Sequence, residues 1–172
     1  TMLICDVSGS MDICIDDLRS AVNNYVSNMH LEEYVSIVTF SNGIEGTTEF
    51  LKDKDRLAEF ANSMHASGGT EIYNTLYSCL STFDAEITSN DTIILMTDGQ
   101  DNNGRDAATI MQEIGGLARE KGVTVYTIGL GDVDASYLST LASSGNGKLV
   151  YVSDSESLTD FYELLQSQVD NQ

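Results

Sequence analysis

Short apolar segments alternate with amphipathic segments along the whole chain, and this alternation constrains the fold more than any other feature. Residues 1–7 (TMLICDV) and 91–99 (DTIILMTDG) are nearly continuous apolar runs. Such runs are typical of strands that are covered on both faces, as in parallel sheets. Residues 105–121 instead carry apolar side chains at helical spacing and stop before Gly122. The alternation predicts repeated βαβ units.

The remaining segments continue this pattern. Further strands are predicted at 34–42, 46–51, 123–131 and 148–153, and further helices at 12–30, 54–64, 71–83, 134–143 and 155–170. Segments 34–42 and 46–51 are separated by a short break around Gly43, so we expect them to form a hairpin. The predicted fold is a doubly wound, Rossmann-like α/β domain. Its six-stranded sheet is mostly parallel with one antiparallel edge strand, and helices cover both faces.

The length of the chain indicates how many domains it forms, and its charge limits the kinds of partner that it can bind. We expect residues 1–172 to form a single domain, cut from a longer protein because the chain begins inside a strand. The formal charge of −19 comes from 27 acidic and 8 basic residues. This charge repels phosphate backbones and anionic membranes, which argues against nucleic-acid binding. No apolar run approaches the roughly 20 residues that span a bilayer, so direct membrane insertion is not expected.

The three cysteines are predicted to be buried and chemically inert. Cys5 lies in the first strand, and Cys14 and Cys79 lie on apolar stripes of predicted helices. No CxxC or Cys/His spacing indicates a metal or redox site. A disulfide between Cys14 and Cys79 remains an open alternative, and so does the redox compartment.

Small oxygen-bearing side chains gather where the first strand ends. In ICDVSGSMD (4–12), Asp6, Ser8 and Ser10 alternate, so an extended chain would point three oxygen atoms in the same direction. Oxygen-only sites suit hard cations such as Mg²⁺, Mn²⁺ or Ca²⁺. A Ser/Gly turn that caps the following helix explains this stretch equally well when it is considered alone.

Two later loops carry matching features. SGGT ends at Thr70, which also suits the N-cap of a helix that begins at Glu71. TDG places Asp98 at the end of another buried strand, so Asp6 and Asp98 are predicted to share the carboxyl edge of the sheet. In this order, DVSGS, SGGT and TDG resemble the von Willebrand factor type A domain, a family that includes the integrin inserted domains. IILMTDGQDNN, KGVTVYTIGLGDVD and LASSGNGKLVYVSD extend the resemblance along nearly the whole chain.

The resemblance implies a metal-ion-dependent adhesion site formed by Asp6, Ser8, Ser10, Thr70 and Asp98, with one or both carboxylates acting through coordinated water. Neutral hydroxyl ligands leave a cation under-neutralised, so it attracts an oxygen anion at an open position. We therefore expect a divalent cation that bridges to a carboxylate of a partner protein. Mg²⁺ is the first choice, with Mn²⁺ and Ca²⁺ as alternatives, and the domain is expected to be monomeric.

Three functions compete. The first is an adhesion module at an extracellular or cell surface, with a cytoplasmic location as the alternative. The acidic charge and the Thr-, Asn- and Asp-rich loops favour a surface-exposed bacterial protein over a human matrix protein. The second is an intracellular regulatory or assembly subunit that docks an acidic segment of an ATPase-type complex. The third, a metal-assisted hydrolase, lacks a His, Lys or Cys placed as base or nucleophile, and the sequence has neither GxSxG nor GxxxxGK[ST]. We expect no enzymatic activity.

The remaining polar candidates are weaker. Asp12 and Asp101 border the metal loops and suit a second cation, although solvated charge is the favoured interpretation. His30 and His65 have no partners at ligand spacing and are interpreted as structural or surface residues.

The resemblance also implies a regulatory element. In switching members of the family the terminal helix slides along the sheet, and the corresponding helix here is 155–170. Phe161, Leu165 and Val169 are expected to pack that helix against the sheet.

Overall fold

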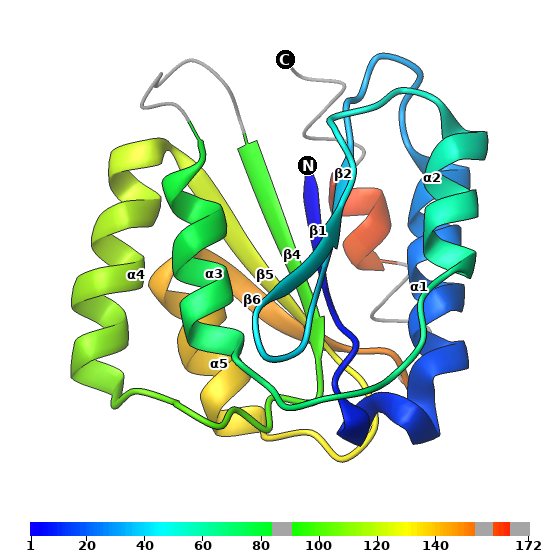
Figure 1. Cartoon of the computed structure of the whole chain (residues 1–172). Helices are drawn as coiled ribbons and strands as arrows, with labels where there is room; N and C mark the ends of the chain where they lie inside the picture. The colour runs from blue at the N-terminus through cyan, green and yellow to red at the C-terminus, as the bar shows by residue number, and fades with distance from the viewer. Residues whose placement is uncertain (84–90, 154–159, 166–172) are drawn as a thin grey trace.

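One mixed sheet of six strands forms the centre of the domain (Figure 1). The computed structural model describes residues 1–83, 91–153 and 160–165. In chain order the strands are β1 (Met2–Asp6), β2 (Ser36–Phe40), β3 (Ile44–Thr47), β4 (Asp91–Thr97), β5 (Val123–Gly129) and β6 (Asn146–Tyr151). Their order across the sheet is β3-β2-β1-β4-β5-β6, with β2 and β3 antiparallel and the other neighbours parallel. This topology confirms the predicted sheet, including its antiparallel edge strand.

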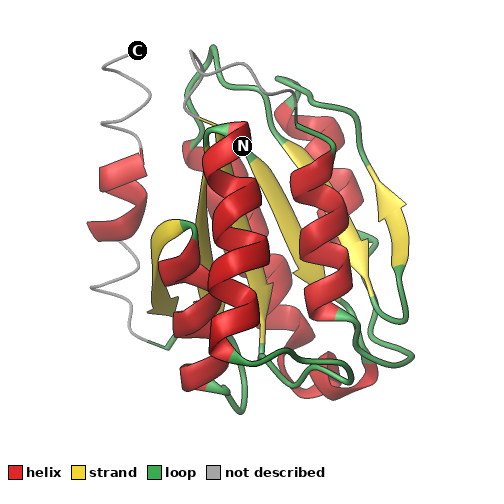
Figure 2. Cartoon of the chain, turned by 90° about the vertical axis from the view of Figure 1, so that its left-hand side faces the viewer, coloured by secondary structure: helices red, strands yellow, loops and turns green. Residues whose placement is uncertain are grey.

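Helices cover both faces of the sheet, as predicted (Figures 1 and 2). They are the 3-10 helix η1 (Gly9–Cys14), α1 (Ile15–Asn28), α2 (Lys54–Asn62), α3 (Ile72–Ser81), α4 (Ala107–Lys121) and α5 (Ala135–Ser144), followed by a helical segment at 160–165. The α1 and α2 helices and the 160–165 segment share one hydrophobic core with the sheet. The α3, α4 and α5 helices share a second core on the opposite face. Among the described residues, no helix is both long and apolar enough to cross a bilayer.

Strand β1 shows why the buried strands are continuous apolar runs. All five of its residues are buried. Leu3 and Cys5 belong to the core under α1, whereas Met2 and Ile4 belong to the core under α3. Because successive side chains of a strand point to opposite faces, a strand with two covered faces has no position that favours a solvated side chain.

Several element boundaries differ from the predictions: β6, for example, covers Asn146–Tyr151 rather than 148–153. Two of the differences have a clear structural cause. The helix predicted from residue 12 begins as α1 only at Ile15, because the chain first forms η1. The hairpin is confirmed, but β3 covers Ile44–Thr47 rather than 46–51. Ile44 pairs with Phe40 across a tight turn, and Leu51 contributes only an isolated bridge to Val35. The turn, rather than the Thr-rich composition, therefore decides where this edge strand starts.

The C-terminal helix prediction is confirmed over the part that the structure describes. Phe161 and Leu165 are buried against the core that contains α1. Val169 and the rest of the predicted 155–170 helix lie outside the described residues.

The cysteines are free and buried, as predicted. Cys14 lies in the core under α1 and Cys79 in the core under α3, so the sheet separates them. This placement removes the alternative of a Cys14–Cys79 disulfide. Burial raises the pKa of Cys79 to about 11. Burial, assisted by nearby carboxylates, also raises the pKa of Cys14 to about 11.

We therefore expect the native thiols to resist labelling, because the thiolate is the reactive form and access is blocked. At pH 8, a thiol-exchange reagent should release its chromophore slowly from native protein and rapidly from protein in denaturant. The denatured sample should titrate three thiols, the number in the sequence. A thiol that reacts in native protein as fast as in denaturant would contradict this prediction.

Candidate metal centre

The candidate site lies where the winding of the sheet changes direction. The chain leaves β1 toward β2 on one side, and β4 pairs with β1 on the other side. The loops that follow β1 and β4 therefore meet at the lower edge of the sheet in Figure 1. Asp6 is the last residue of β1, and Asp98 directly follows β4. The structure thus places both carboxylates at one edge, as the sequence predicts.

The carboxylate of Asp6 is fully buried (0% exposed) and held at both oxygen atoms. Its Oδ1 accepts a hydrogen bond from the Ser8 amide at 2.9 Å, and its Oδ2 accepts one from the Thr97 hydroxyl at 2.6 Å. The Thr97 hydroxyl in turn accepts from the Gly99 amide at 3.1 Å. These bonds fix the orientation of Asp6 and tie the β1 loop to the β4 loop. Sequence reasoning missed Thr97, although the threonine of TDG is a hydroxyl at the end of a buried strand.

The two serines lie next to each other. The Ser8 and Ser10 hydroxyl oxygens are 3.2 Å apart. Ser8 is buried, whereas Ser10 is exposed in the first turn of η1. The two hydroxyls thus come together, although Ser10 lies in the 3-10 helix η1 rather than in the extended chain that the motif predicts.

The SGGT loop is fastened to both neighbouring loops. The Gly9 amide donates to the Gly68 carbonyl at 2.9 Å, and the Asn102 amide donates to the Thr70 carbonyl at 2.9 Å. Gly68 has a φ of +85°, which favours glycine. At Gly69 a Cβ would lie 2.4 Å from the Asn42 side-chain oxygen. The small residues of this loop are therefore needed to bring buried Thr70 between the β1 and β4 loops.

Thr70 does not cap the helix that follows it, contrary to the N-cap prediction. Helix α3 begins at Ile72, and Glu71 before it makes no side-chain cap. The amides of Ile72 and Tyr73 donate instead to the two oxygens of Asp101, at 3.2 and 2.9 Å. The cap is supplied from the β4 loop, which leaves the Thr70 hydroxyl without a role in the helix cap.

Asp98 is the second buried carboxylate, with 3% of its surface exposed. Its Oδ1 accepts from the Gln100 amide at 2.9 Å, and its carbonyl accepts from the Asp134 amide at 2.8 Å. Burial raises the pKa of Asp6, and the nearby charge of Asp98 adds to the rise, while hydrogen bonds from Ser8 and Thr97 oppose it. The carboxylates of Asp6 and Asp98 therefore repel each other when both are ionised.

This arrangement fits a hard divalent cation. Over the described ranges, neither Asp6 nor Asp98 forms an ion pair with a basic side chain. Buried charges are normally paired or coordinate metals. The same part of the chain contains no group of three or more His, Cys, Asp or Glu side chains arranged for a metal. A complete cation site here would therefore depend on the hydroxyls of Ser8, Ser10 and Thr70 beside the two carboxylates.

The four weaker polar candidates of the sequence analysis have different environments in the structure. Asp12 is exposed on η1, as expected of a solvated charge. Asp101 is half-buried, and its carboxylate oxygens accept hydrogen bonds from four donors, so the solvated-charge interpretation of this residue is wrong. His65 is exposed, and His30 accepts a hydrogen bond from the Glu32 amide at 3.2 Å. Both histidines therefore act as surface or structural residues, as predicted.

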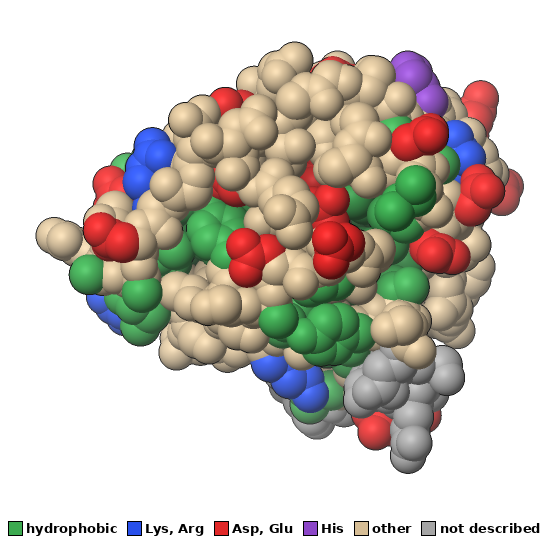
Figure 3. Space-filling view, turned by 90° about the horizontal axis from the view of Figure 1, so that it is seen from below, with side chains coloured by type: hydrophobic (Ala, Val, Ile, Leu, Met, Phe, Trp, Pro, Cys, Tyr) green, Lys and Arg blue, Asp and Glu red, His purple; other side chains and the backbone are tan. Residues whose placement is uncertain are grey.

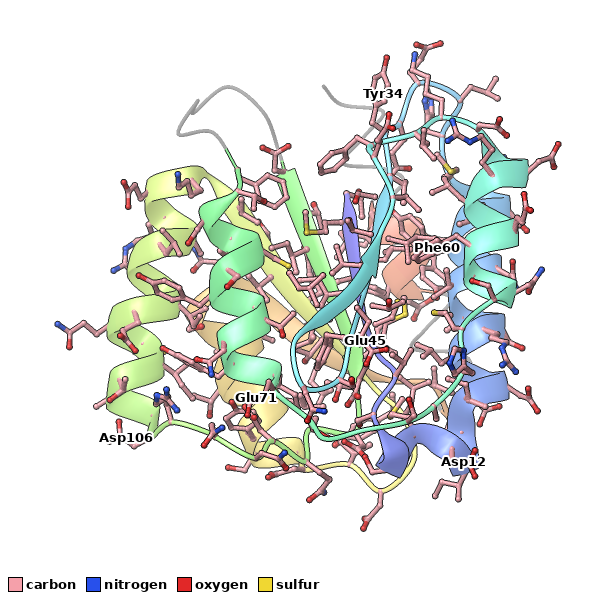
Figure 4. All side chains as sticks on the ribbon, in the orientation of Figure 1. Asp12, Tyr34, Glu45, Phe60, Glu71 and Asp106 are labelled. Atoms are coloured by element: carbon pink, nitrogen blue, oxygen red, sulfur yellow. The ribbon has the colours of Figure 1, made fainter. Side chains whose placement is uncertain are left out.

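The face that carries these loops is acidic. Figure 3 views this edge of the molecule and shows Asp and Glu side chains near its middle, with Lys and Arg only toward the rim. Figure 4 places Asp12 and Glu71 at the same edge, on the η1 and α3 sides. A negatively charged partner would be repelled by this face unless a cation compensated the charge.

Fold and sequence together define the class of protein. The chain belongs to the von Willebrand factor type A domain family, whose sequence profile matches residues 2–164. It is 30% identical over 179 residues to mouse calcium-activated chloride channel regulator 3A-1, which covers 96% of this chain and 19% of that protein. It is 29% identical over 161 residues to human calcium-activated chloride channel regulator 1, covering 88% of this chain and 17% of that protein. The chain thus spans less than a fifth of the length of these relatives.

Solved structures share the fold. An aerotolerance-related membrane protein from Bacteroides fragilis superposes with a TM-score of 0.79 at 15% identity, over 99% of this chain and 98% of that chain. A von Willebrand factor type A protein from Catenulispora acidiphila superposes with a TM-score of 0.76 at 23% identity, over 96% and 41% of the two chains. Domains of this family typically act as protein-interaction or adhesion modules and are generally not catalytic.

Proposed function

We propose that this domain binds one divalent cation and uses it to hold a carboxylate of a partner protein, as a metal-ion-dependent adhesion site similar to that of the integrin inserted domains. The proposed ligands are Asp6, Ser8, Ser10, Thr70 and Asp98. The observation that carries the proposal is the burial of two neighbouring carboxylates that no basic side chain of the described residues pairs. Mg²⁺ is the expected ion, and Mn²⁺ or Ca²⁺ would suit the same oxygen donors.

Each part of the site has a distinct task in this proposal. Asp6 and Asp98 supply the negative charge, and their hydrogen bonds to Ser8, Thr97 and Gln100 hold them in place before the ion binds. Hydroxyl ligands orient the ion without neutralising it. The bound ion would supply a Lewis-acidic position for an oxygen anion. The acidic face around it then rejects acidic partners that do not reach the ion, which gives the contact its selectivity.

The setting of this interaction is also part of the proposal. We place the domain at an extracellular surface, as a non-enzymatic interaction module. The related fold of the Porphyromonas gingivalis type V pili tip protein Mfa5, with a TM-score of 0.74 at 13% identity, supports such a setting. The second candidate is a regulatory subunit that docks an acidic segment of its target. The names of the chloride channel regulators, which describe regulation, support this alternative.

Calorimetric titration of Mg²⁺, Mn²⁺ and Ca²⁺ into metal-free protein tests the cation site. We expect one ion per chain in wild type and loss of binding in Ser8→Ala and Asp98→Ala, because each removes a proposed ligand. A saturating ion should also raise thermal stability, by about 2.7 kcal/mol at a free concentration of 100 times Kd.

The matched control is Ser36→Ala. Ser36 is also a buried serine, but it begins β2 at the opposite edge of the sheet, and its hydroxyl donates to the Thr48 carbonyl at 2.8 Å. This variant should bind the ion as wild type does. No binding in wild type, or binding that Ser8→Ala and Asp98→Ala leave intact, would overturn the proposal.

A further inference from the structure

A carboxylate outside the proposed ligand set joins three elements around the site. Asp101 accepts hydrogen bonds from the amides of Ile72 and Tyr73 at the start of α3, at 3.2 and 2.9 Å. It also accepts from the Asn103 amide at 3.1 Å and from the hydroxyl of Tyr137 on α5 at 2.6 Å. The two carboxylate oxygens of Asp101 thus accept four hydrogen bonds, from donors in α3, in α5 and in the β4 loop itself.

The Asp101 carboxylate caps the N-terminus of α3, which has no capping side chain of its own. The first amides of a helix have no partners within the helix, and a negative charge near them is favourable. Most helices obtain this cap from a residue just before the first turn, as α4 does from Asp106, which accepts from the Thr109 amide at 2.7 Å. The residue before α3, Glu71, makes no such bond. The start of α3 is therefore held by the β4 loop.

The hydrogen bonds around Asp101 connect two of the proposed metal-binding motifs. Thr70 lies two residues before α3, and Asp98 lies three residues before Asp101. The amide of Asp101 donates to the Gly99 carbonyl at 3.1 Å, and the amide of Asn102 donates to the Thr70 carbonyl at 2.9 Å. The separation between Thr70 and Asp98 is thus set by a short, hydrogen-bonded connection that runs through Asp101.

We propose that Asp101 is a positioning residue, which fixes the spacing of Thr70 and Asp98 and thereby sets the affinity of the site for its cation without touching the ion. The inference rests on the proposed function, because it concerns the same cation. Loss of an outer-shell partner typically lowers metal affinity about 10- to 100-fold. We expect a loss in this range for Asp101→Ala, together with an altered Mn²⁺ electron paramagnetic resonance spectrum because the ligand arrangement changes.

Three variants separate positioning from charge and from general stability. Asp106→Ala removes the cap of α4, which lies at the same lower edge in Figure 4 but on the other side of Glu71 from Asp12, so it controls for the loss of a helix cap. Asp12→Ala removes an exposed charge at the same edge as the site, so it controls for electrostatic attraction. Asp101→Asn removes the charge but retains an acceptor oxygen, so it should recover part of the affinity and the wild-type Mn²⁺ spectrum.

The experiment is a Mn²⁺ titration of the five proteins, followed by spectra at saturation and by amide hydrogen exchange of Ile72 and Tyr73 without metal. Asp101→Ala should show weak binding, an altered spectrum and faster exchange, while Asp106→Ala and Asp12→Ala keep wild-type affinity within about threefold. Wild-type affinity and spectrum in Asp101→Ala, or an equal loss in Asp106→Ala or Asp12→Ala, would overturn the inference while leaving the cation site standing. Failure of wild type itself to bind Mn²⁺ would overturn the proposed function and this inference with it.

Discussion

Asp6→Asn should abolish cation binding and yet leave the metal-free domain at least as stable as wild type. The change removes a carboxylate that we propose as a direct ligand, so the affinity loss should exceed the roughly 10- to 100-fold effect of an outer-shell change. The amide can occupy the same place: its oxygen can accept from the Ser8 amide, and its nitrogen can donate to the Thr97 hydroxyl, which reverses the direction of that hydrogen bond. The mutation also removes a buried charge that repels Asp98.

The pH dependence of this effect has a definite sign. Burial raises the pKa of Asp6 above its ordinary value of 3.8, so the folded protein binds a proton that the unfolded chain releases. Ionisation of Asp6 therefore costs stability above the folded pKa, and the cost disappears below the unfolded pKa. Without metal, Asp6→Asn should exceed wild type in stability most at neutral pH, and the difference should vanish below about pH 3.8.

Urea denaturation across pH, with and without Mg²⁺, measures both the loss of cation binding and the pH dependence of stability. Asp17→Asn is the control, because it removes an exposed acidic charge from the first turn of α1. Asp17→Asn should keep the stabilisation by Mg²⁺, whereas Asp6→Asn should lose it. A metal-free Asp6→Asn protein that is markedly less stable than wild type at pH 7 would show that the Asp6 carboxylate is needed for folding itself.

Phe161→Ala should cause the largest loss of stability among these variants, about 3–5 kcal/mol. Phe161 is fully buried, and its ring meets Tyr126 of β5 edge to face with centroids 4.9 Å apart. It also lies 5.9 Å from the Tyr162 ring. Removal of the ring leaves a cavity between the 160–165 segment and the sheet, so the attachment of this segment is lost together with the packing energy.

Equilibrium urea denaturation of the metal-free protein measures the loss, with Glu163→Ala as the matched control. Glu163 is an exposed position in the same helical segment, and a surface change of this kind should stay within about 0.5 kcal/mol of wild type. A Phe161→Ala protein with a midpoint close to that of Glu163→Ala would mean that the terminal segment contributes little to the fold.

The fold could be predicted from the sequence because its dominant signals are local. A strand such as β4, with six consecutive buried residues after Asp91, has an apolar run that needs no knowledge of the rest of the chain. The start of β3 could not be found in this way, because the pairing of Ile44 with Phe40 depends on the geometry of the turn between them. Local composition alone therefore placed the start of that strand two residues too late and its end four residues too late.

In the candidate site, too, some residues could be predicted from local sequence signals and others could not. Asp6, Ser8 and Asp98 could be placed from motifs and from the rule that parallel strands end at a common edge. Thr97 and Asp101 could not, because their roles depend on which loops meet across the sheet. A threonine inside a strand and an aspartate after a turn are ordinary by sequence, and only the contacts with Asp6 and α3 distinguish them.

The bond between Thr97 and Asp6 has a consequence for the order in which the domain assembles. It joins residues 91 positions apart, and the cap of α3 by Asp101 joins residues 28 and 29 positions apart. A chain made from its N-terminus therefore exposes DVSGS and SGGT before the strand that orients them exists. Because such long-range contacts form only when the intervening chain has closed, capture of the ion in the proposed site would follow completion of the sheet. Adhesion would then be restricted to finished domains, and nascent or truncated chains would be unable to engage partners prematurely.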